Sequence, residues 1–366
     1  MLFRSTLITN GALESGTIKW DMNEPLDGLK TIVIPSRSLP VVMSKIDRKI
    51  FPDFEMEWYY SIKSSLDRLA KEEQFDVLLS TSPPESAHVI AAELKAISGA
   101  KWIADLRDLW AYDHYRRYGG VHRKILTIME KNVLGKADII TTVSETWTKF
   151  LSRTYPGKVM FVPNSFDPDW FGGDNVLSGE KFRITYLGKL DPYSQDIRQL
   201  FAALKKCMED GTIPSNSVEV DFYIGGYRKP DISAIAKEYG LSDTVKEHST
   251  VSLQNSINIM KNSSVLLLVG WKGISQEGWY SQKVFEYLGA ANPVLLINGS
   301  GNVELSSFIK NTGCGVAAES VEDMKTALIK FYNDFKTGNR LVPGREREKY
   351  SCPSVIGGLA DIIDKL

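Results

Sequence analysis

The stretch that decides the fold is Ser281-Gln-Lys-Val-Phe-Glu-Tyr-Leu-Gly-Ala-Ala-Asn-Pro-Val-Leu-Leu-Ile297. Its apolar residues first recur at helical spacing, Gly289–Asn292 then supply stop signals, and Val294–Ile297 is typical of a buried strand. Lys283 and Glu286 are three residues apart, which places both on one face of the first helical turns. Free backbone N–H groups and the helix dipole favour an anion there, so a phosphate-bearing ligand would suit the site. A surface Lys–Glu pair on an amphipathic helix is the equally open alternative.

Length and charge set the broad class of the protein. The 366 residues exceed the size at which one hydrophobic core stops growing, so two domains are expected. Lys and Arg total 44 against 45 for Asp and Glu, and this balance gives no indication of nucleic-acid binding. The three cysteines, Cys207, Cys314 and Cys352, match no metal spacing and indicate structural thiols in a reducing compartment.

The sequence contains no recognisable membrane or export signal. No apolar run approaches the roughly 20 residues that span a bilayer, and the opening residues are too short and polar a stretch for a signal peptide. We therefore expect a cytoplasmic protein, and peripheral contact with a membrane stays open.

Short apolar runs alternate with helical patterns along most of the chain, which predicts an α/β protein with parallel, doubly wound sheets. The stretch Asn164–Gly179 is rich in Asn, Asp, Pro and Gly, breaks this alternation and predicts a linker. We expect Rossmann-like domains over residues 1–166 and 172–345, with the final helix, about 350–366, packing back on the first domain. Two such domains would face a central cleft at the carboxyl ends of their strands, where α/β proteins bind ligands.

The individual elements follow from the same periodicities. The expected strands are Arg4–Thr9, Thr31–Pro35, Phe75–Ser80, Lys101–Ala104, Asp138–Val143, Val159–Pro163, Phe182–Leu187, Val218–Ile224, Val245–His248, Val265–Val269, Val294–Ile297 and Gly315–Ala317. The expected helices, besides the one in the opening stretch, are Trp58–Glu72, Ala87–Ser98, Val121–Lys136, Ser144–Tyr155, Ile197–Glu209, Asp231–Tyr239, Leu253–Lys261, Val303–Thr312, Val321–Lys336 and Ser354–Leu366.

A glycine and a lysine follow the first expected strand of the second domain. Gly188 would let a ligand approach the backbone, and Lys189 or the later Arg198 could neutralise a diphosphate. The G-x-x-x-x-G-K-[ST] pattern of a P-loop is absent. An ordinary turn between a strand and a helix is the alternative.

Charged residues also follow a buried strand of the first domain, in the string Trp102-Ile-Ala-Asp-Leu-Arg-Asp-Leu-Trp110. Its two carboxylates, Asp105 and Asp108, and the guanidinium of Arg107 could bind sugar hydroxyls, or could bind an acceptor and deprotonate it. An internal ion-pair network is the equally open alternative. The spacing does not match a D-x-D metal motif, because the aspartates are three residues apart and their partner is an arginine.

Other catalytic patterns find little support. The four histidines show no metal-ligand spacing, so no metal is expected. His88 and His114 are the two that we expect to flank the cleft. No Ser–His–Asp or Cys–His arrangement is recognisable, and no G-x-G-x-x-G follows an expected strand, which disfavours hydrolase and dehydrogenase functions.

In this order the pieces resemble a GT-B-fold glycosyltransferase, similar to retaining family 4 ("group 1") enzymes of bacterial surface-polysaccharide synthesis. Phe75–His88 and Trp102–Trp110 resemble an N-terminal pair of strings in that branch. Ala137–Glu145, followed by Val162–Asp167, resembles the family's strand–Ser–helix element and its "P-N-G-[VF]-D" linker entry. Lys283-Val-Phe-Glu-Tyr-Leu-Gly-Ala-Ala-Asn-Pro-Val294 resembles the donor-site pattern "K-x-x-E-[YA]-x-A-x-G-x-P-V". The ordered set covers most of the chain.

The resemblance implies a nucleotide-sugar site in the C-terminal domain. Glu286 would hold the ribose hydroxyls of the nucleotide. Lys283, together with Lys189 or Arg198, would meet the diphosphate beside Gly188. The sugar would move with retention to a saccharide or lipid-linked saccharide, with no metal and no cofactor other than the nucleotide-sugar co-substrate.

The resemblance also implies that the N-terminal loops, with Asp105 and Asp108, face the acceptor. The family's E-x7-E motif is incomplete here, because Glu277 precedes Glu286 by nine residues and Gly278 occupies the motif position. Either Glu277 serves through a one-residue insertion, or this catalytic role is missing.

Two alternatives to sugar transfer stay open. A GT-B-fold sugar-nucleotide 2-epimerase would place acid and base groups around the sugar without a separate acceptor. A non-catalytic homologue that binds a nucleotide sugar is the other. The family usually begins with a strand and a Gly-rich loop near the donor phosphates, and here Gly11 and Gly16 are poor substitutes for that loop.

Overall fold

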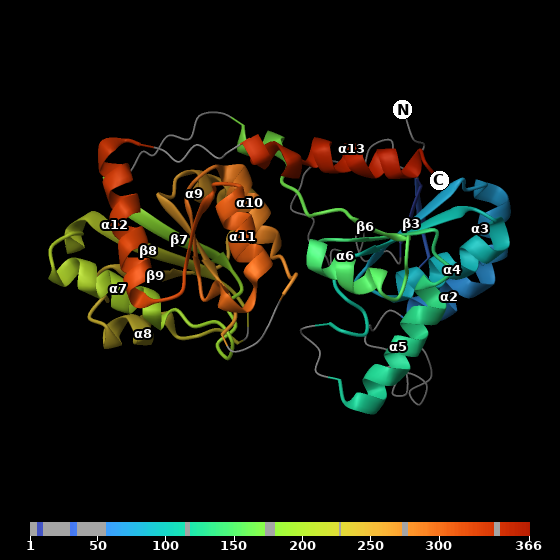
Figure 1. Ribbon diagram of the computed structural model, residues 1–366, viewed down its shortest axis with the longest axis horizontal. Helices are drawn as coiled ribbons and strands as arrows, with labels where there is room; N and C mark the ends of the chain where they lie inside the picture. Colours follow the sequence, from blue (N-terminus) through green and yellow to red (C-terminus); the bar gives the residue numbers. More distant parts are fainter. Residues whose placement is uncertain are drawn as a thin grey trace. The chain divides into compact units, whose positions relative to one another are not determined.

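The computed structural model describes residues 6–9, 30–34, 56–113, 118–172, 180–226, 228–272, 277–339 and 345–366. The chain divides into two compact units, which are Met1–Val162 with Leu359–Leu366 (unit 1) and Pro163–Gly358 (unit 2). Each unit contains a parallel sheet with helices packed on it (Figure 1). The predicted α/β class with two parallel, helix-covered sheets is therefore confirmed.

Unit 1 is built on a four-stranded parallel sheet in the order β3-β4-β5-β6. These strands are β3 (Val77–Ser82), β4 (Lys101–Leu106), β5 (Ile139–Thr142) and β6 (Val159–Phe161). A separate parallel pair joins β1 (Thr6–Thr9) to β2 (Lys30–Val33). The helices described in this unit are α2 (Met56–Ile62), the 3-10 turn η1 (Lys63–Ser65), α3 (Leu66–Glu73), α4 (Ser86–Ser98), α5 (Gly120–Leu134) and α6 (Glu145–Ser152).

Unit 2 has six parallel strands in the order β12-β11-β10-β7-β8-β9. They are β7 (Phe182–Gly188), β8 (Val218–Ile224), β9 (Val245–His248), β10 (Val265–Val269), β11 (Val294–Ile297) and β12 (Gly315–Ala318). Its helices are η2 (Pro168–Phe171), α7 (Arg198–Glu209), η3 (Ser215–Ser217), α8 (Ile232–Glu238), α9 (Leu253–Lys261), α10 (Gln282–Ala290), η4 (Gly299–Gly301), α11 (Val303–Asn311), α12 (Val321–Thr337) and η5 (Arg345–Tyr350). The last helix, α13 (Cys352–Ile363), contains the boundary between the units.

The direction in which strands are added reverses between β7 and β10, the first and fourth strands of unit 2. This is the Rossmann order, and the loops that leave the carboxyl ends of such a strand pair diverge to opposite sides of the sheet. Ligands of open α/β sheets bind at this switch point. The loops after β7 and β10 are therefore the place to look for the site in unit 2.

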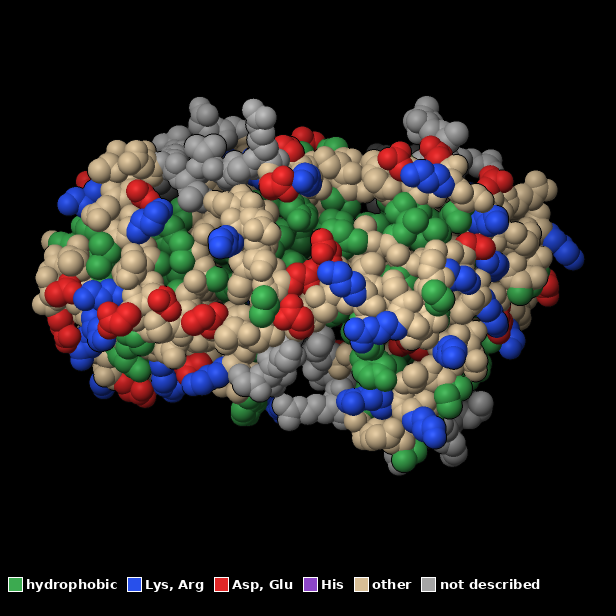
Figure 2. Space-filling view, in the orientation of Figure 1, with side chains coloured by type: hydrophobic (Ala, Val, Ile, Leu, Met, Phe, Trp, Pro, Cys, Tyr) green, Lys and Arg blue, Asp and Glu red, His purple; other side chains and the backbone are tan. Residues whose placement is uncertain are grey.

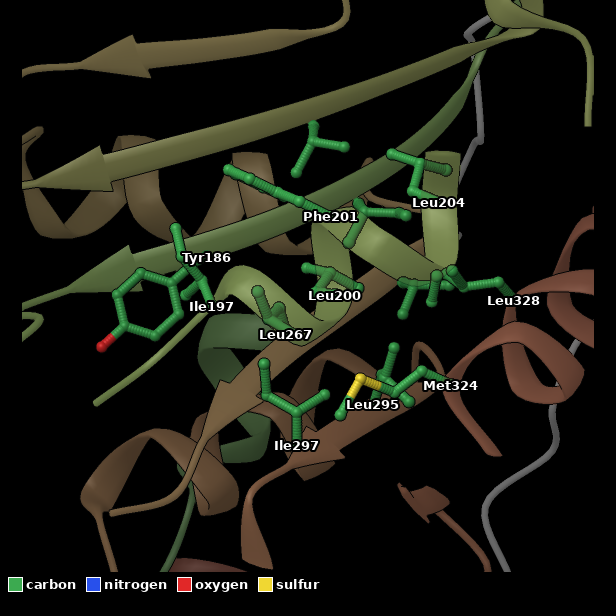
Figure 3. Packing of buried hydrophobic residues seen from close by; sticks show 14 of the residues in the cluster. Tyr186, Ile197, Leu200, Phe201, Leu204, Leu267, Leu295, Ile297, Met324 and Leu328 are labelled. Atoms are coloured by element: carbon green, nitrogen blue, oxygen red, sulfur yellow. The ribbon is translucent and has the colours of Figure 1, made fainter. Parts of the chain in front are cut away.

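Strands β10 and β11 of unit 2 are buried on both faces, which is why they read as continuous apolar runs. Leu267 and Leu295 pack in one cluster with residues of α7, α8 and α12 (Figure 3). Their neighbours Leu266 and Leu296 pack in a second cluster with residues of α9, α10 and α11. Successive side chains of a strand point to opposite faces, so the same short run serves both cores.

The predicted elements agree with the structure in type and order, and the differences are at the ends. Strand β4 runs two residues further than expected, so Asp105 lies in the strand and not in the loop. The predicted helix at Trp58–Glu72 is divided by η1. Part of the predicted linker is ordered as η2, whose Phe171 is buried. His114 and the glycines near the N-terminus lie outside the described residues.

Membrane-spanning helices are not found in the part of the chain that the structure describes. No helix there is both long and apolar enough to cross a bilayer.

Helix α10 ends within the stretch Gly289–Asn292, as the sequence predicts, and the residues of this stretch have different roles. Gly289 lies inside its last turn, where a Cβ would meet a ring carbon of Phe171 at 2.6 Å, so this glycine allows close packing and does not stop the helix. The helix ends at Ala291, which has a left-handed φ of 57°. Ala291 occupies the position of the glycine in the family's donor-site pattern. That conformation is unfavourable for an alanine and easy for a glycine.

We expect Ala291→Gly to stabilise the protein by about 0.5–1 kcal/mol, because the relief of left-handed strain exceeds the added entropy of the unfolded chain. Denaturant unfolding of the full chain measures this difference. The matched control is Ala290→Gly, one residue earlier and within the helix, which should destabilise by about 1 kcal/mol or more. A loss of stability in Ala291→Gly as large as that of the control would contradict the assigned helix end.

Candidate functional site

The candidate site lies where β7 and β10 end and α10 begins. Three hydrogen bonds tie the loop after β7 to the neighbouring strand ends. Gln195 Nε2 donates to the carbonyl oxygen of Val269 at 2.7 Å, and Asn298 Nδ2 donates to that of Asp196 at 2.6 Å. The backbone N–H of Lys272 donates to the carbonyl oxygen of Ser194 at 2.6 Å. The sequence does not indicate this contact, because 78 residues separate the two. The loop is thereby fixed at the switch point of the sheet.

Lys283 is the cation of this site. Its Nζ donates to the hydroxyl oxygen of Tyr186 at 2.9 Å and to the carbonyl oxygen of Lys189 at 3.4 Å. The same ammonium lies 4.4 Å from the centroid of the Tyr186 ring, within cation–π range. Burial lowers the pKa of Lys283 to about 8, with the nearby Glu286 acting in the opposite direction. The site therefore holds a partly desolvated cation with few compensating charges.

Gly188 makes room for this lysine. A Cβ on Gly188 would lie 2.4 Å from Cε and 2.8 Å from Nζ of Lys283. Its φ of +116° is also one that side-chain-bearing residues rarely adopt. The last residue of β7, Gly188, and Lys283 of α10 are 95 residues apart in the chain but form one close contact in the site. Sequence analysis singled out both residues but could not show this contact.

Glu286 lies one helical turn after Lys283, but the two do not form an ion pair. Among the described residues, the Glu286 carboxylate has neither a hydrogen bond nor an ion pair. Burial raises its pKa, and Lys283 partly offsets this effect. A simple surface Lys–Glu pair is therefore not what the structure shows. A carboxylate that is partly buried, perturbed in pKa and without a protein partner is typical of a binding site.

The other predicted cations differ in their surroundings. Lys189 is exposed, and only its backbone carbonyl takes part in the contacts described above. Arg198 is the first residue of α7, is exposed, and pairs with Asp196 at 3.5 Å. Lys272, which sequence analysis did not single out, pairs with the same carboxylate at 3.4 Å.

Glu277 caps a helix. Its two carboxylate oxygens accept hydrogen bonds from the backbone N–H groups of Val303 and Glu304, each at 2.9 Å. These are the first residues of α11, so a negative charge is favourable there. The contact spans 26 residues and leaves no trace in a local motif. A catalytic role for Glu277 stays a prediction.

Asp105 is a buried junction between three strands of unit 1. Its carboxylate accepts from Thr81 of β3 at 3.0 Å and from Thr141 of β5 at 2.6 Å. It also accepts from Nε of Arg107 at 2.8 Å. The internal network that the sequence left open as an alternative is therefore present. Asp108 lies beyond the strand, partly buried, and its predicted role stays a prediction.

His88 lies in the core of unit 1, and its expected position beside the cleft stays a prediction. Its side chain is fully buried, with ring centroids 6.4 Å from Trp102 and 6.3 Å from Trp110. Nδ1 is 2.8 Å from the hydroxyl oxygen of Ser80. Burial lowers the pKa of His88 to about 3, which leaves the imidazole neutral and unsuited to acid chemistry at neutral pH.

Comparisons with known proteins agree with this architecture. Residues 33–170 match the family model Glycosyltransferase Family 4. Sucrose-phosphate synthase from Thermosynechococcus elongatus superposes with a TM-score of 0.67 at 14% identity, covering 99% of both chains. A glycosyltransferase from Rickettsia africae gives 0.64 at 12% identity, covering 100% of this chain and 99% of that one. Anabaena HepE in complex with UDP gives 0.65 at 10% identity, covering 93% and 87%. No curated protein sequence matches the chain.

These matches confirm the resemblance that the sequence motifs indicated. At such low identities the solved structures establish the fold, and the family model covers the N-terminal part of the chain. The chain has the GT-B fold of glycosyltransferases, and its residues 33–170 match the family model Glycosyltransferase Family 4.

Proposed function

We propose that this chain is a cytoplasmic glycosyltransferase of polysaccharide synthesis. It moves a sugar from a nucleotide-sugar donor to a saccharide or lipid-linked saccharide acceptor, with retention and without a metal. The observation that carries the proposal is the carboxylate of Glu286, which is unpaired among the described residues, beside the desolvated ammonium of Lys283 at the switch point of unit 2. Structures of the similar protein HepE are complexes with UDP and with UDP-glucose.

Glu286 binds the ribose of the nucleotide in this proposal. Its carboxylate has no hydrogen-bond partner in the part of the chain that the structure describes, so it can accept hydrogen bonds from two neighbouring hydroxyl groups. These hydrogen bonds give the buried Glu286 carboxylate the partners that it lacks among the described residues. Binding of the ligand therefore also stabilises the protein.

Lys283 binds the diphosphate of the donor. Its ammonium is fixed by Tyr186 and by the Lys189 carbonyl beside the N-terminus of α10, whose free N–H groups also favour an anion. Departure of the nucleoside diphosphate leaves additional negative charge on these oxygens. A cation that is already in place stabilises that charge more in the transition state than in the ground state. Lys189, exposed at the same loop, adds a second positive charge.

The acceptor is handled by unit 1 in this proposal. Asp108 contacts the acceptor hydroxyl, and Asp105 acts as a positioning residue that fixes Arg107 and the ends of β3, β4 and β5. The 2-epimerase alternative needs acid and base groups around the sugar. It is less well supported, since His88 is fully buried and its lowered pKa disfavours the protonated form that an acid requires.

Replacing Glu286 by alanine should weaken binding of the preferred nucleotide by about 10- to 100-fold, the cost of charge-assisted hydrogen bonds. Thermal shifts of the full chain with UDP, GDP, ADP and TDP, and with their sugars, measure this. Glu209→Ala is the control, because Glu209 is an exposed glutamate at the end of α7 that pairs only with Lys205 among the described residues. An unchanged nucleotide shift in Glu286→Ala would remove Glu286 from the site.

Nucleotide affinity should depend on pH through Lys283. Its pKa of about 8 means that the ammonium is present below that pH and is lost above it. The affinity is therefore expected to be level from about pH 6.5 to 8 and then to fall by up to about tenfold per pH unit. Calorimetric titration with the preferred nucleoside diphosphate measures the profile. Lys283→Met should bind more weakly and should show no fall above pH 8, and an identical fall in this variant would assign it to another group.

Transfer itself is tested by the release of free nucleotide. With a nucleotide sugar alone, only slow hydrolysis is expected, and adding a saccharide or lipid-linked saccharide acceptor should accelerate release severalfold. Release or sugar interconversion at full rate without an acceptor would favour the 2-epimerase. Nucleotide binding with no turnover under either condition would favour the non-catalytic homologue.

A further inference from the structure

Asp196 lies at the switch point of unit 2, in the loop between β7 and α7. Its carboxylate faces two cations, with Nη1 of Arg198 at 3.5 Å and Nζ of Lys272 at 3.4 Å. Figure 2 shows Lys and Arg interspersed with Asp and Glu over the visible face of unit 2, so contacts between opposite charges are common there. Asp196 is distinguished by its place, because it puts a negative charge where the proposed donor site needs positive charge.

The carboxylate of Asp196 is held in place more firmly than the two cations. Its Oδ1 accepts a hydrogen bond from the backbone N–H of Arg198 at 3.0 Å, and its backbone carbonyl accepts one from Asn298 Nδ2 at 2.6 Å. Its side chain is 24% exposed, whereas those of Arg198 and Lys272 are 50% and 66% exposed. Long exposed side chains retain much of their rotamer freedom. The acid is therefore fixed at the switch point, and the two cations can move.

Both ion pairs of Asp196 are loose. Their lengths exceed the roughly 2.7–2.9 Å of a strong charge-assisted hydrogen bond. Exposed ion pairs of this kind contribute little to stability. In the part of the chain that the structure describes, neither Arg198 nor Lys272 has an ion pair with another acid. A ligand that offers more negative charge than one carboxylate can therefore draw both cations away at little cost, and a diphosphate does so.

We propose that Asp196 is an internal counter-anion, which competes with the diphosphate of the donor for Arg198 and Lys272. The inference rests on the proposed function and adds these three residues to the diphosphate site of Lys283. Without ligand, the carboxylate keeps both cations at the switch point. The donor diphosphate draws them away, and the carboxylate takes them back as the nucleoside diphosphate leaves. Asp196 thereby weakens the binding of this product and speeds its release, a step that limits the turnover of many enzymes.

Replacing Asp196 by asparagine tests this role, because the variant loses the charge and keeps an oxygen that can accept the Arg198 N–H. Calorimetric titration of the full chain with UDP, GDP, ADP, TDP and inorganic pyrophosphate measures the affinities. The affinity for pyrophosphate and for the tightest-binding nucleotide should rise by about three- to tenfold. In stopped-flow measurements, the dissociation rate of that nucleotide should fall by a similar factor. Asp196→Ser, which also keeps an acceptor, should give the same gain.

Asp191→Asn is the matched control for net charge. Asp191 lies in the same loop and accepts a hydrogen bond from the Ser194 hydroxyl, which an asparagine oxygen can also accept. Its carboxylate forms no ion pair with the residues that the structure describes. The control therefore removes one negative charge from the loop without releasing a cation. Its affinity for the same ligands should change by less than about twofold.

A double-mutant cycle shows whether Asp196 acts through its two cations. Arg198→Met combined with Lys272→Met should lower the affinity for the diphosphate. Adding Asp196→Asn to that variant should then give no further gain than the Asp191→Asn control does. A full gain without the two cations would mean that Asp196 only repels the ligand, and the proposed competition would be wrong.

The remaining outcomes separate this inference from the proposed function. If the unaltered protein binds a nucleoside diphosphate and Asp196→Asn binds it equally or more weakly, the proposed function stands and the role of Asp196 is wrong. Weaker binding in particular would mean that Asp196 positions the cations for the ligand. If neither protein binds any of the four nucleotides or pyrophosphate, both the donor site and the counter-anion are wrong.

Discussion

The constraint on which unit 2 depends is the position of the Lys283 ammonium, held against the Tyr186 ring at a place where only Gly188 leaves room for it. Tyr186 is in β7 and Lys283 in α10, so this contact connects the first strand of the unit to the helix that follows its fourth. Tyr287 adds a second link, because its hydroxyl accepts from the backbone N–H of Leu187 at 3.4 Å. The start of α10 is thereby fixed relative to the central strand.

The strand order explains why the candidate site lies at the carboxyl ends of the central strands of this sheet. Parallel strands all end on the same side, and the order β12-β11-β10-β7-β8-β9 makes the loops after β7 and β10 diverge. Hydrogen bonds of Ser194, Gln195 and Asp196 then fix the backbone of the loop after β7 in this region. A rigid frame of this kind is what a charge-stabilising site requires, since its groups need not reorganise when a ligand arrives.

How much the sequence predicts depends on whether the signal is local. The helix and strand of the opening stretch follow from periodicity, and the structure has them as α10 and β11. The contacts of Glu277 with Val303, and of Asp105 with Thr81 and Thr141, could not be predicted, because these partners lie 24 to 36 residues away in the chain. Asp105 was also misplaced in a loop, since a charged residue inside a buried strand contradicts the usual pattern unless several donors surround it.

The end of α10 illustrates a second limit. The sequence predicts the helix-stopping role for the stretch Gly289–Asn292 but does not assign it to one residue, and glycine is the usual residue at such a position. The structure gives that role to Ala291 and uses Gly289 for contact with Phe171. Two requirements compete for glycine within three residues, and composition alone cannot say which position has the left-handed backbone.

The burial of the charged groups of Lys283 and Glu286 lowers the stability of the protein when no ligand is bound. Each is partly buried, burial shifts the pKa of each towards the neutral form, and neither neutralises the other through an ion pair. A chain selected for stability alone would exchange them for apolar residues or bring them together. The hydrophobic clusters on both faces of the sheet supply the stability that tolerates this arrangement. Local departures of this kind are expected where a ligand completes the interactions of buried charged groups, and the nucleotide diphosphate proposed above would do so for both residues.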